Sequence, residues 1–247
     1  MDVDLVIFDK DGTLIDIHYY WGGMIKLRSE MLSKKYIKVS AQKKVTKELM
    51  SIMGINLATG KIRSTGPIGI NPREFIIALV SKTMEQHYSA ITPEQVSDVF
   101  IEIDIYSQKH LERLVKPLPG VENLLMRLKR QQIKIAIATT DLTSRAKLAM
   151  DSIGLSQYFD YIAGSDLVDK AKPSPDLVDY LCKKLSSNKN KTVVVGDSIV
   201  DFRMAKLAGV GFIGVKTGLY SPEFLKGSKN LVENLENIEG VLWKKVY

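Results

Sequence analysis

The chain has 247 residues, of which 45% are hydrophobic, and its 35 Lys and Arg against 28 Asp and Glu give a formal net charge of +7. This length and apolar content indicate a globular protein with one large domain or two modest ones. The longest apolar runs are far shorter than the roughly 20 residues of a membrane helix, and the first residues are acidic where a signal peptide is basic, so we expect a cytoplasmic protein without a membrane segment.

The positive charge is densest between residues 26 and 47, a stretch with many lysines and few acids. A solvated helix face explains this stretch most simply, and electrostatic steering of an anionic substrate is the alternative. The charge permits nucleic-acid binding, but no aromatic or arginine-rich motif accompanies it, and we expect no nucleic-acid partner. The single cysteine, Cys182, forms no internal disulfide and receives no chemical role.

The first predicted element is a buried strand within residues 4–13, which ends in Asp9 and Asp11. Alternate side chains of a strand point the same way, so both acids are predicted to face one site and Lys10 to point away from them. A cation stabilises one such acid as an anion, while a different environment lets the other carry a proton. The pattern is typical of phosphate chemistry; the alternative is a strand that runs into an Asp-Gly turn at Gly12.

Helical spacing begins at about Ile15 and lasts for roughly 100 residues, which indicates an insertion after the first strand. Helices are predicted near residues 18–36, 40–53, 72–89 and 93–114. Asn71 and Thr92 each precede a proline and stand three residues before Glu74 and Gln95, a capping pattern that predicts where the last two helices begin. The predicted division is a core of residues 1–15 and 117–247 and an insertion of residues 16–116.

Alternation of strands and helices resumes after the proline-rich residues 116–120. Strands are predicted near residues 133–138, 161–163, 192–195 and 210–215, and helices near residues 121–131, 143–152, 175–186 and 199–208. Ser174 is the expected cap of the third of these helices, with Pro175 at its first position. Apolar strands that alternate with helices indicate an α/β protein whose parallel sheet is covered on both faces.

Polar residues follow three of the predicted strands, at the carboxyl edge where such sheets bind ligands. Asp9 and Asp11 follow the first strand, Thr139 and Thr140 the second, and Gly196-Asp197-Ser198 a later one. Lys172 lies in a loop between the last two groups. This set provides a carboxylate nucleophile, a metal-binding acid, a hydroxyl donor and an ammonium group, which together hold a phosphoryl group.

The order of these motifs resembles that of the haloacid dehalogenase-like hydrolase superfamily, phosphoglycolate phosphatase-like branch. Four motifs carry the resemblance across nearly the whole chain: Asp9-Lys10-Asp11-Gly12-Thr13, Thr139, Lys172 before Pro173, and Gly196-Asp197-Ser198 with Asp201. The resemblance implies an α/β fold with a Rossmann-like parallel sheet core and an inserted α-helical cap domain.

The resemblance also implies a role for each motif residue. Asp9 attacks phosphorus to form an aspartyl-phosphate, and Asp11 protonates the leaving oxygen and then activates water. Mg²⁺ is bound by Asp9, by Asp11 through its backbone carbonyl, and by Asp197. Thr139 and Lys172 bind the phosphate oxygens on which charge accumulates.

Two further positions, Asp201 and Thr140, each allow two interpretations. Ser198 and Asp201 fit a helix-capping box, so Asp201 either binds the metal directly or supports the site through the cap. Thr140 either contacts the phosphate or begins the following turn.

We therefore expect a magnesium-dependent phosphoric monoester hydrolase that acts on a small phosphorylated metabolite, of the phosphoglycolate or sugar-phosphate type, as a monomer or homodimer. Asp11 favours a phosphatase over a dehalogenase, which attacks carbon and needs no leaving-group acid there. A sugar-phosphate mutase, which shares all four motifs, and a catalytically idle binding module are the alternatives. Three residues of the glycine-rich loop predicted at residues 54–70 are candidate contacts for the rest of the substrate, unless that loop is an ordinary exposed connection: Lys61, Arg63 and Ser64.

Overall fold

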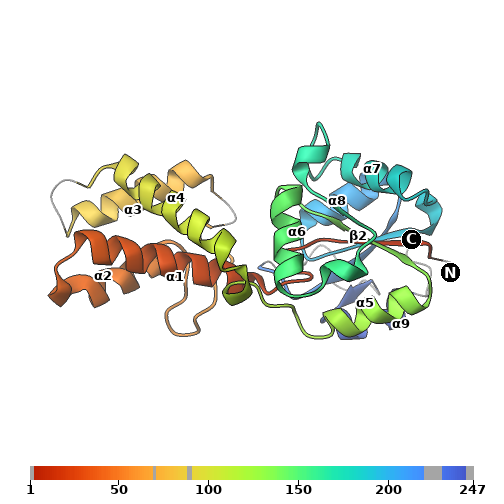
Figure 1. Cartoon of the computed structure of the whole chain (residues 1–247), viewed down its shortest axis with the longest axis horizontal. Coiled ribbons are helices and arrows are strands. Elements are labelled where there is room, and N and C mark those ends of the chain that lie inside the picture. Colours follow the sequence, from red (N-terminus) through yellow and green to blue (C-terminus); the bar gives the residue numbers. More distant parts are fainter. Residues whose placement is uncertain (1–2, 69–70, 88–90, 220–229, 243–247) are drawn as a thin grey trace. The chain divides into compact units, whose positions relative to one another are not determined.

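The computed structural model describes residues 3–68, 71–87, 91–219 and 230–242. The chain divides into two compact units: an α/β unit, formed by Met1–Ile17 and Val115–Tyr247, and a helical unit, formed by His18–Leu114 (Figure 1). Within the described ranges, no helix is both long enough and apolar enough to cross a membrane.

A parallel sheet forms the centre of the α/β unit. Its described strands are β1 (Leu5–Phe8), β2 (Lys134–Ala138), β3 (Tyr161–Ala163), β4 (Thr192–Gly196), β5 (Gly211–Val215) and β6 (Leu231–Val232), in the order β3-β2-β1-β4-β5-β6. Phe8 of β1 is in register with Ile137 of β2 and Val195 of β4. This register brings the residues that follow β1, β2 and β4 to the same edge of the sheet.

Helices cover both faces of this sheet, which explains why all four residues of β1 are buried. The helices are α5 (Val121–Arg130), α6 (Thr143–Ser152), α7 (Asp176–Lys184), α8 (Ile199–Ala208) and α9 (Glu239–Leu242). Figure 1 shows α7 and α8 on one side of the sheet and α5 and α9 on the other. Leu181 of α7 and Met204 of α8 are fully buried in one core cluster with Leu5 of β1. The predicted Rossmann-like α/β class is confirmed.

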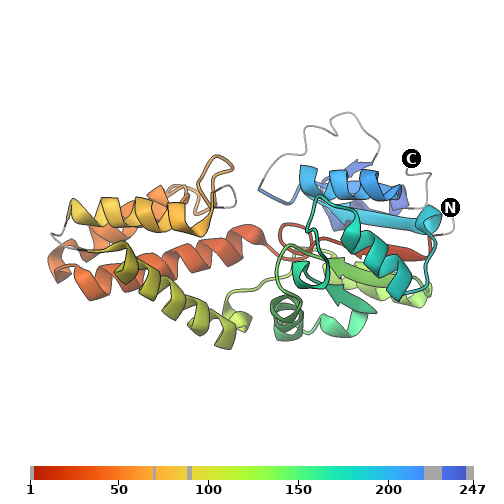
Figure 2. The same ribbon diagram turned by 90° about the horizontal axis from the view of Figure 1, so that it is seen from above.

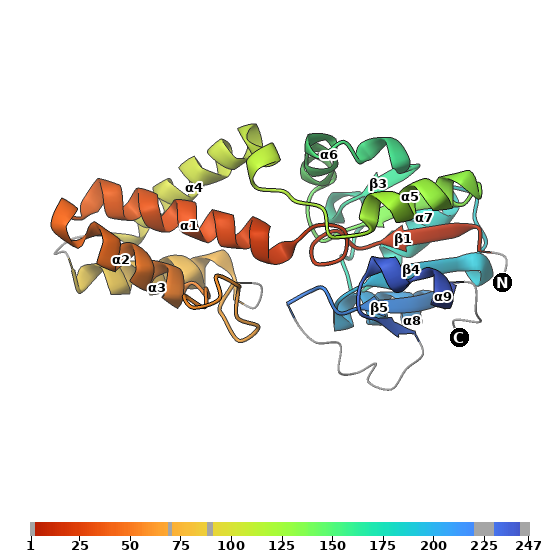
Figure 3. The same ribbon diagram turned by 90° about the horizontal axis from the view of Figure 1, so that it is seen from below.

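The described residues of the helical unit form long α-helices packed side by side (Figures 2 and 3). They are α1 (Ile17–Tyr36), α2 (Val39–Ile52), α3 (Arg73–Glu85) and α4 (Pro93–Lys109). Each contributes a fully buried apolar side chain to the unit's core: Leu32, Leu49, Val80 and Phe100. The predicted capping box of α4 is confirmed, because the Thr92 hydroxyl accepts from the Gln95 amide at 3.3 Å and the Thr92 amide donates to the Gln95 side chain at 3.0 Å.

Two predicted helix starts are wrong by one position. The N-cap of α3 is Pro72 rather than Asn71, since the chain is still extended at the proline (ψ 161°) and becomes helical only afterwards. The N-cap of α7 is Pro175 rather than Ser174, whose hydroxyl is hydrogen-bonded to the Asp176 carboxylate instead of to the helix backbone. The predicted end of the third helix, at residue 89, lies outside the described residues.

Candidate active site

Three carboxylates converge at the carboxyl edge of the sheet. Asp9 directly follows β1, Asp197 directly follows β4, and Asp201 lies in the first turn of α8. One oxygen from each lies within 4.8 Å of the others, and Asp197 and Asp201 are buried. Carboxylate oxygens are the ligands that hard divalent cations prefer, so the donor set fits Mg²⁺.

The Lys172 ammonium group joins two of these carboxylates. Its Nζ donates to Oδ1 of Asp9 at 2.7 Å and to Oδ1 of Asp201 at 2.6 Å, and its side chain is 2% exposed. Burial lowers the pKa of Lys172, but its two carboxylate partners raise that pKa by more, so the side chain is charged. One ammonium group against three acids, two of them buried, leaves an excess of negative charge.

Burial, together with the neighbouring carboxylates, raises the pKa of two of the acids. Burial raises the pKa of Asp9, Lys172 opposes the shift and Asp201 adds to it, and the result is a pKa of about 7. Burial, followed by the charges of Asp9 and Asp201, raises the pKa of Asp197 well above its ordinary value. A divalent cation would relieve the repulsion between these carboxylates, which is a second reason why the residues fit such an ion.

Asp201 also closes the capping box of α8. Its Oδ2 accepts from the Ser198 amide at 3.2 Å and from the Ser198 hydroxyl at 2.5 Å, and the Ser198 hydroxyl accepts from the Asp201 amide at 3.3 Å. The capping interpretation is therefore confirmed. Because Oδ1 already accepts from Lys172, both oxygens of Asp201 have protein partners, and direct metal binding by Asp201 stays a prediction.

The Asp11 side chain forms an ion pair with Lys10. Its Oδ2 lies 2.7 Å from Nζ of Lys10, which also lies 3.4 Å from Oδ2 of Asp141. The expectation that Lys10 points away from Asp11 is wrong, because β1 ends at Phe8 and strand alternation does not extend into the turn that follows. A metal contact through the backbone carbonyl of Asp11 stays a prediction.

The two threonines after β2 differ in their surroundings. Thr139 is buried, and its hydroxyl oxygen accepts from the Asp141 amide at 3.2 Å. A hydroxyl that accepts one hydrogen bond still has a proton to donate, which suits Thr139 to a phosphate oxygen. Thr140 is exposed.

The loop after β5 reaches the same site, which the sequence reasoning missed. The Thr217 hydroxyl donates to the Gly12 carbonyl at 2.6 Å, and a Cβ atom on Gly218 would lie only 1.7 Å from Oδ2 of Asp197. The Thr13 hydroxyl holds the other oxygen, Oδ1 of Asp197, at 3.2 Å. The available signal was a polar, glycine-containing segment directly after a buried strand of the sheet.

The candidate substrate residues of the helical unit lie on the loop between α2 and α3. All three are exposed: Lys61, Arg63 and Ser64. The Ile62 amide donates to Nδ1 of His18 at 3.3 Å, which places the loop beside the start of α1 (Figure 2). The Arg63 side chain donates to the Ser51 carbonyl at the end of α2, at 2.5 Å.

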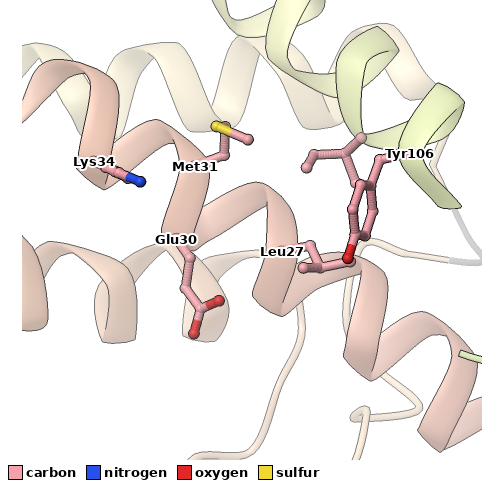
Figure 4. Close-up of a pocket in the computed structure, with 6 residues that line it drawn as sticks. Leu27, Glu30, Met31, Lys34 and Tyr106 are labelled. Atoms are coloured by element: carbon pink, nitrogen blue, oxygen red, sulfur yellow. The ribbon is translucent and has the colours of Figure 1, made fainter. Parts of the chain in front are cut away.

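The helical unit also contains a pocket of about 190 Å³ between α1 and α4 (Figure 4). Its lining residues are Leu27, Glu30, Met31, Lys34, Ile103 and Tyr106. None of the predicted site residues lines this pocket.

The fold and the site define an α/β protein with an acidic, metal-compatible cluster at the carboxyl edge of its parallel sheet. Residues 3–209 match the family model of haloacid dehalogenase-like hydrolases, and the chain belongs to this family. The family resemblance predicted from the four motifs is confirmed.

The comparisons with individual proteins agree with this family. The pyrophosphatase PpaX of Halalkalibacterium halodurans is 27% identical over 210 residues, which are 85% of this chain and 82% of that protein. A crystal structure of a predicted phosphoglycolate phosphatase from Haemophilus somnus has a TM-score of 0.69 at 19% identity and covers 98% of both chains. A subfamily IA hydrolase of the superfamily from Geobacter sulfurreducens has a TM-score of 0.66 at 17% identity and covers 98% of this chain and 97% of its own. At these identities the two structures show a shared fold.

Proposed function

We propose that this chain is a Mg²⁺-dependent phosphatase that hydrolyses a small phosphomonoester through an aspartyl-phosphate on Asp9. The observation that carries the proposal is the position of the Asp9 carboxylate at the end of a central strand, 2.7 Å from Nζ of Lys172 and in one cluster with Asp197. A carboxylate nucleophile beside a metal-binding acid and a fixed ammonium group is suited to attack on a phosphate.

Asp9, Asp197 and the backbone carbonyl of Asp11 would hold the Mg²⁺ ion. When bound, the ion supplies positive charge that lowers the repulsion between a carboxylate nucleophile and a phosphate dianion. Lys172 supplies a further positive charge from the protein, and with Thr139 it would bind the phosphate oxygens.

Two steps complete the proposed reaction. First, an oxygen of Asp9 attacks phosphorus, and the bond to the leaving oxygen breaks; that oxygen keeps the electron pair and takes a proton from Asp11. Second, water attacks the phosphorus of the aspartyl-phosphate while Asp11 takes a proton from the water. The bond between phosphorus and Asp9 then breaks, which releases inorganic phosphate and restores both acids.

The substrate would be chosen by the helical unit, acting as a cap with Lys61, Arg63 and Ser64 on its α2–α3 loop. The hydrogen bond from Ile62 to His18 supports this role, because it ties the loop to the start of α1, a few residues after Asp11 along the chain. The 27% identity to a pyrophosphatase PpaX over most of the chain supports inorganic pyrophosphate as a second candidate substrate. A sugar-phosphate mutase would share the first step and return the phosphoryl group to a sugar.

The test is phosphate release from phosphoglycolate, sugar phosphates, nucleoside monophosphates and pyrophosphate, with Mg²⁺ or with a chelator. We expect Mg²⁺-dependent release that Asp9→Asn lowers by about 10⁴-fold or more, because the nucleophile is lost. Asp179→Asn, which changes an exposed acid of α7, is the control and should keep full activity. Release that survives Asp9→Asn would exclude Asp9 as the nucleophile, and no release from any substrate would favour a mutase or an idle module.

A further inference from the structure

Lys10 is a buried charge in the turn after β1. Its side chain is 3% exposed, and its Nζ lies 2.7 Å from Oδ2 of Asp11 and 3.4 Å from Oδ2 of Asp141. Lysine is almost never fully buried unless it is paired, because removing its charge from water is costly. The ion pairs with Asp11 and Asp141 therefore explain how the charge of Lys10 can be buried.

The two oxygens of the Asp11 carboxylate are not equivalent. Oδ2 is paired with Lys10, whereas Oδ1 is buried and accepts no hydrogen bond from the described part of the chain. A buried carboxyl oxygen without a partner costs free energy. A water molecule can donate to Oδ1 when the group is ionised, and a protonated Oδ1 can donate to a substrate oxygen. Oδ1 is thus the oxygen left for proton transfer.

Asp141 fixes the other side of Lys10. The Asp141 amide donates to Oγ1 of Thr139 at 3.2 Å, and its Oδ1 accepts from the Leu142 amide at 2.8 Å. The carboxylate is therefore held by the backbone of the loop after β2, with Oδ2 facing Lys10. Lys10 links the turn that carries Asp11 to the loop that carries Thr139.

We propose that Lys10 is a positioning residue for Asp11: anchored by Asp141, it holds Oδ2 so that Oδ1 faces the leaving oxygen of the substrate. This inference rests on the proposed phosphatase function and assigns a role to the residue between the two acids of the first motif. A displaced proton donor slows the reaction most where the leaving oxygen needs a proton. An alkyl phosphate has such a leaving group, whereas 4-nitrophenyl phosphate releases a stable anion.

The test compares the full-length parent with Lys10→Met, in the presence of Mg²⁺, on an alkyl phosphate and on 4-nitrophenyl phosphate. The value of kcat/KM covers the steps up to departure of the leaving group, so it leaves out the later hydrolysis of the aspartyl-phosphate. We expect Lys10→Met to lower kcat/KM by about 10- to 100-fold for the alkyl ester and by less than about threefold for the nitrophenyl ester. Lys10→Arg should recover most of the loss, because it keeps the positive charge.

The matched control is Lys129→Met, which removes another Lys–Asp pair of 2.7 Å in the same unit. Its partner Asp160 lies just before β3, at the opposite edge of the sheet, so both esters should be hydrolysed as by the parent. An equal loss on both esters in Lys10→Met would overturn the positioning role while the phosphatase function stands. If the parent hydrolyses neither these esters nor the wider substrate panel, the proposed function fails and this inference fails with it.

Circular dichroism reports whether Lys10→Met folds. If it does not fold, Asp141→Asn takes its place, since this change loosens the anchor without emptying the Lys10 position. A loss that is larger for the alkyl ester supports the inference, and a loss that does not depend on the leaving group rejects it.

Discussion

At the scale of single residues, the Asp197 carboxylate leaves no room for a side chain on Gly218. A Cβ atom there would lie 1.7 Å from Oδ2 of Asp197, so Gly218→Ala must displace either the carboxylate or the loop after β5. Because Asp197 is a proposed metal ligand, we expect the variant to bind Mg²⁺ about tenfold more weakly or worse. Calorimetric titration of the protein with Mg²⁺ measures this change.

Gly240→Ala is the matched control for Gly218→Ala. Gly240 lies in α9 of the same unit, and a Cβ atom on it would meet no atom within 4 Å. Its Mg²⁺ affinity should equal that of the parent. An unchanged affinity in Gly218→Ala as well would mean that Asp197 is not a ligand or that the loop moves aside without cost.

The raised pKa of Asp9 predicts a pH dependence for metal binding. Without metal the pKa is about 7, against an ordinary value of 3.8, because burial disfavours the charged form. Mg²⁺ binds the ionised carboxylate, so binding releases a proton, and the affinity should fall by up to about tenfold per pH unit below pH 7 through Asp9 alone. Titrations in two buffers of different ionisation enthalpy count the released protons.

The same shift sets the sign of a stability change in the metal-free protein. Between pH 3.8 and about 7 the folded state holds a proton on Asp9 that the unfolded state has released. The contribution of Asp9 to stability is therefore greatest below pH 3.8 and declines as the pH rises to about 7. In Asp9→Asn this pH dependence of the unfolding free energy should disappear. If Asp9→Asn releases as many protons on binding Mg²⁺ as the parent does, the released proton does not come from Asp9.

The residues that sequence reasoning found and those that it missed differ in one physical respect. Asp9 and Asp197 directly follow apolar strands, so the carboxyl edge of a parallel sheet brings them together. Lys10 was placed wrongly because the direction of a side chain in a turn depends on its ion-pair partners. Gly218 and Thr217 were missed because they meet the site only through contacts with residues about 20 or about 200 positions away along the chain.

At the scale of elements, one ionic cluster joins three helices of the helical unit. Asp104 of α4 accepts from Arg28 of α1 at 2.8 Å and from Arg73 of α3 at 2.5 Å. The Arg28 side chain is 7% exposed, and the central carbon of its guanidinium group lies 4.4 Å from the ring centre of Phe100. Asp104→Ala would leave this charge buried without its partner, so we expect a loss of about 3 kcal/mol in the free energy of unfolding, measured by urea denaturation.

Glu102→Ala provides the control on the same pair of helices. Glu102 of α4 pairs with Lys35 of α1 at 2.5 Å, but the two side chains are 48% and 40% exposed. Exposed pairs contribute little, so the loss should stay below about 1 kcal/mol. Equal losses in the two variants would show that Asp104 acts only as a surface charge.

The Asp104 cluster also predicts how the helical unit responds to acid. Burial raises the pKa of Asp104, but hydrogen bonds from Arg73 and Arg28 outweigh burial and hold that pKa below its ordinary value of 3.8. A lowered pKa means that the stabilisation is present above pH 3.8 and is lost as the pH falls through the pKa of the folded state. The difference in unfolding free energy between parent and Asp104→Ala should therefore stay constant from pH 7 to about 5 and shrink below about pH 4.

Elements with local sequence signals were predicted closely, whereas elements whose formation depends on pairing with another segment were not. The bounds of α6, α8 and β3 agree with the prediction. For α8 the local signals are the Ser198 cap at its start and Gly209, in a left-handed conformation, at its end. The strand β6 was not predicted, because its two residues are too few for a pattern and it exists through pairing with β5. The capping residues predicted for α3 and α7 lie one position too early, because the proline itself is the N-cap of each helix.

At the scale of the whole molecule, the chemistry and the proposed choice of substrate belong to different units. Asp9, Lys172, Asp197 and Asp201 all lie in the α/β unit, and the hydrogen bonds described above for Lys172 and Asp197 join residues of that unit. The buried core of the helical unit is formed by its own side chains, such as Leu49, Val80 and Phe100. A ligand of the carboxylate cluster should therefore stabilise the α/β unit directly and leave the stability of the helical unit unchanged.

Hydrogen exchange with and without Mg²⁺ tests this separation. At a free Mg²⁺ concentration of 100 times its Kd, binding stabilises the state that holds the ion by about 2.7 kcal/mol. We expect the amides of Val6 in β1 and Val194 in β4 to gain protection up to this amount, and those of Leu49 in α2 and Val80 in α3 to stay unchanged. Potassium chloride at equal ionic strength controls for screening, and Asp9→Asn should lose most of the effect. An equal gain of protection in α2 and α3 would show that the two units unfold together, and the metal would then stabilise the chain as one cooperative body.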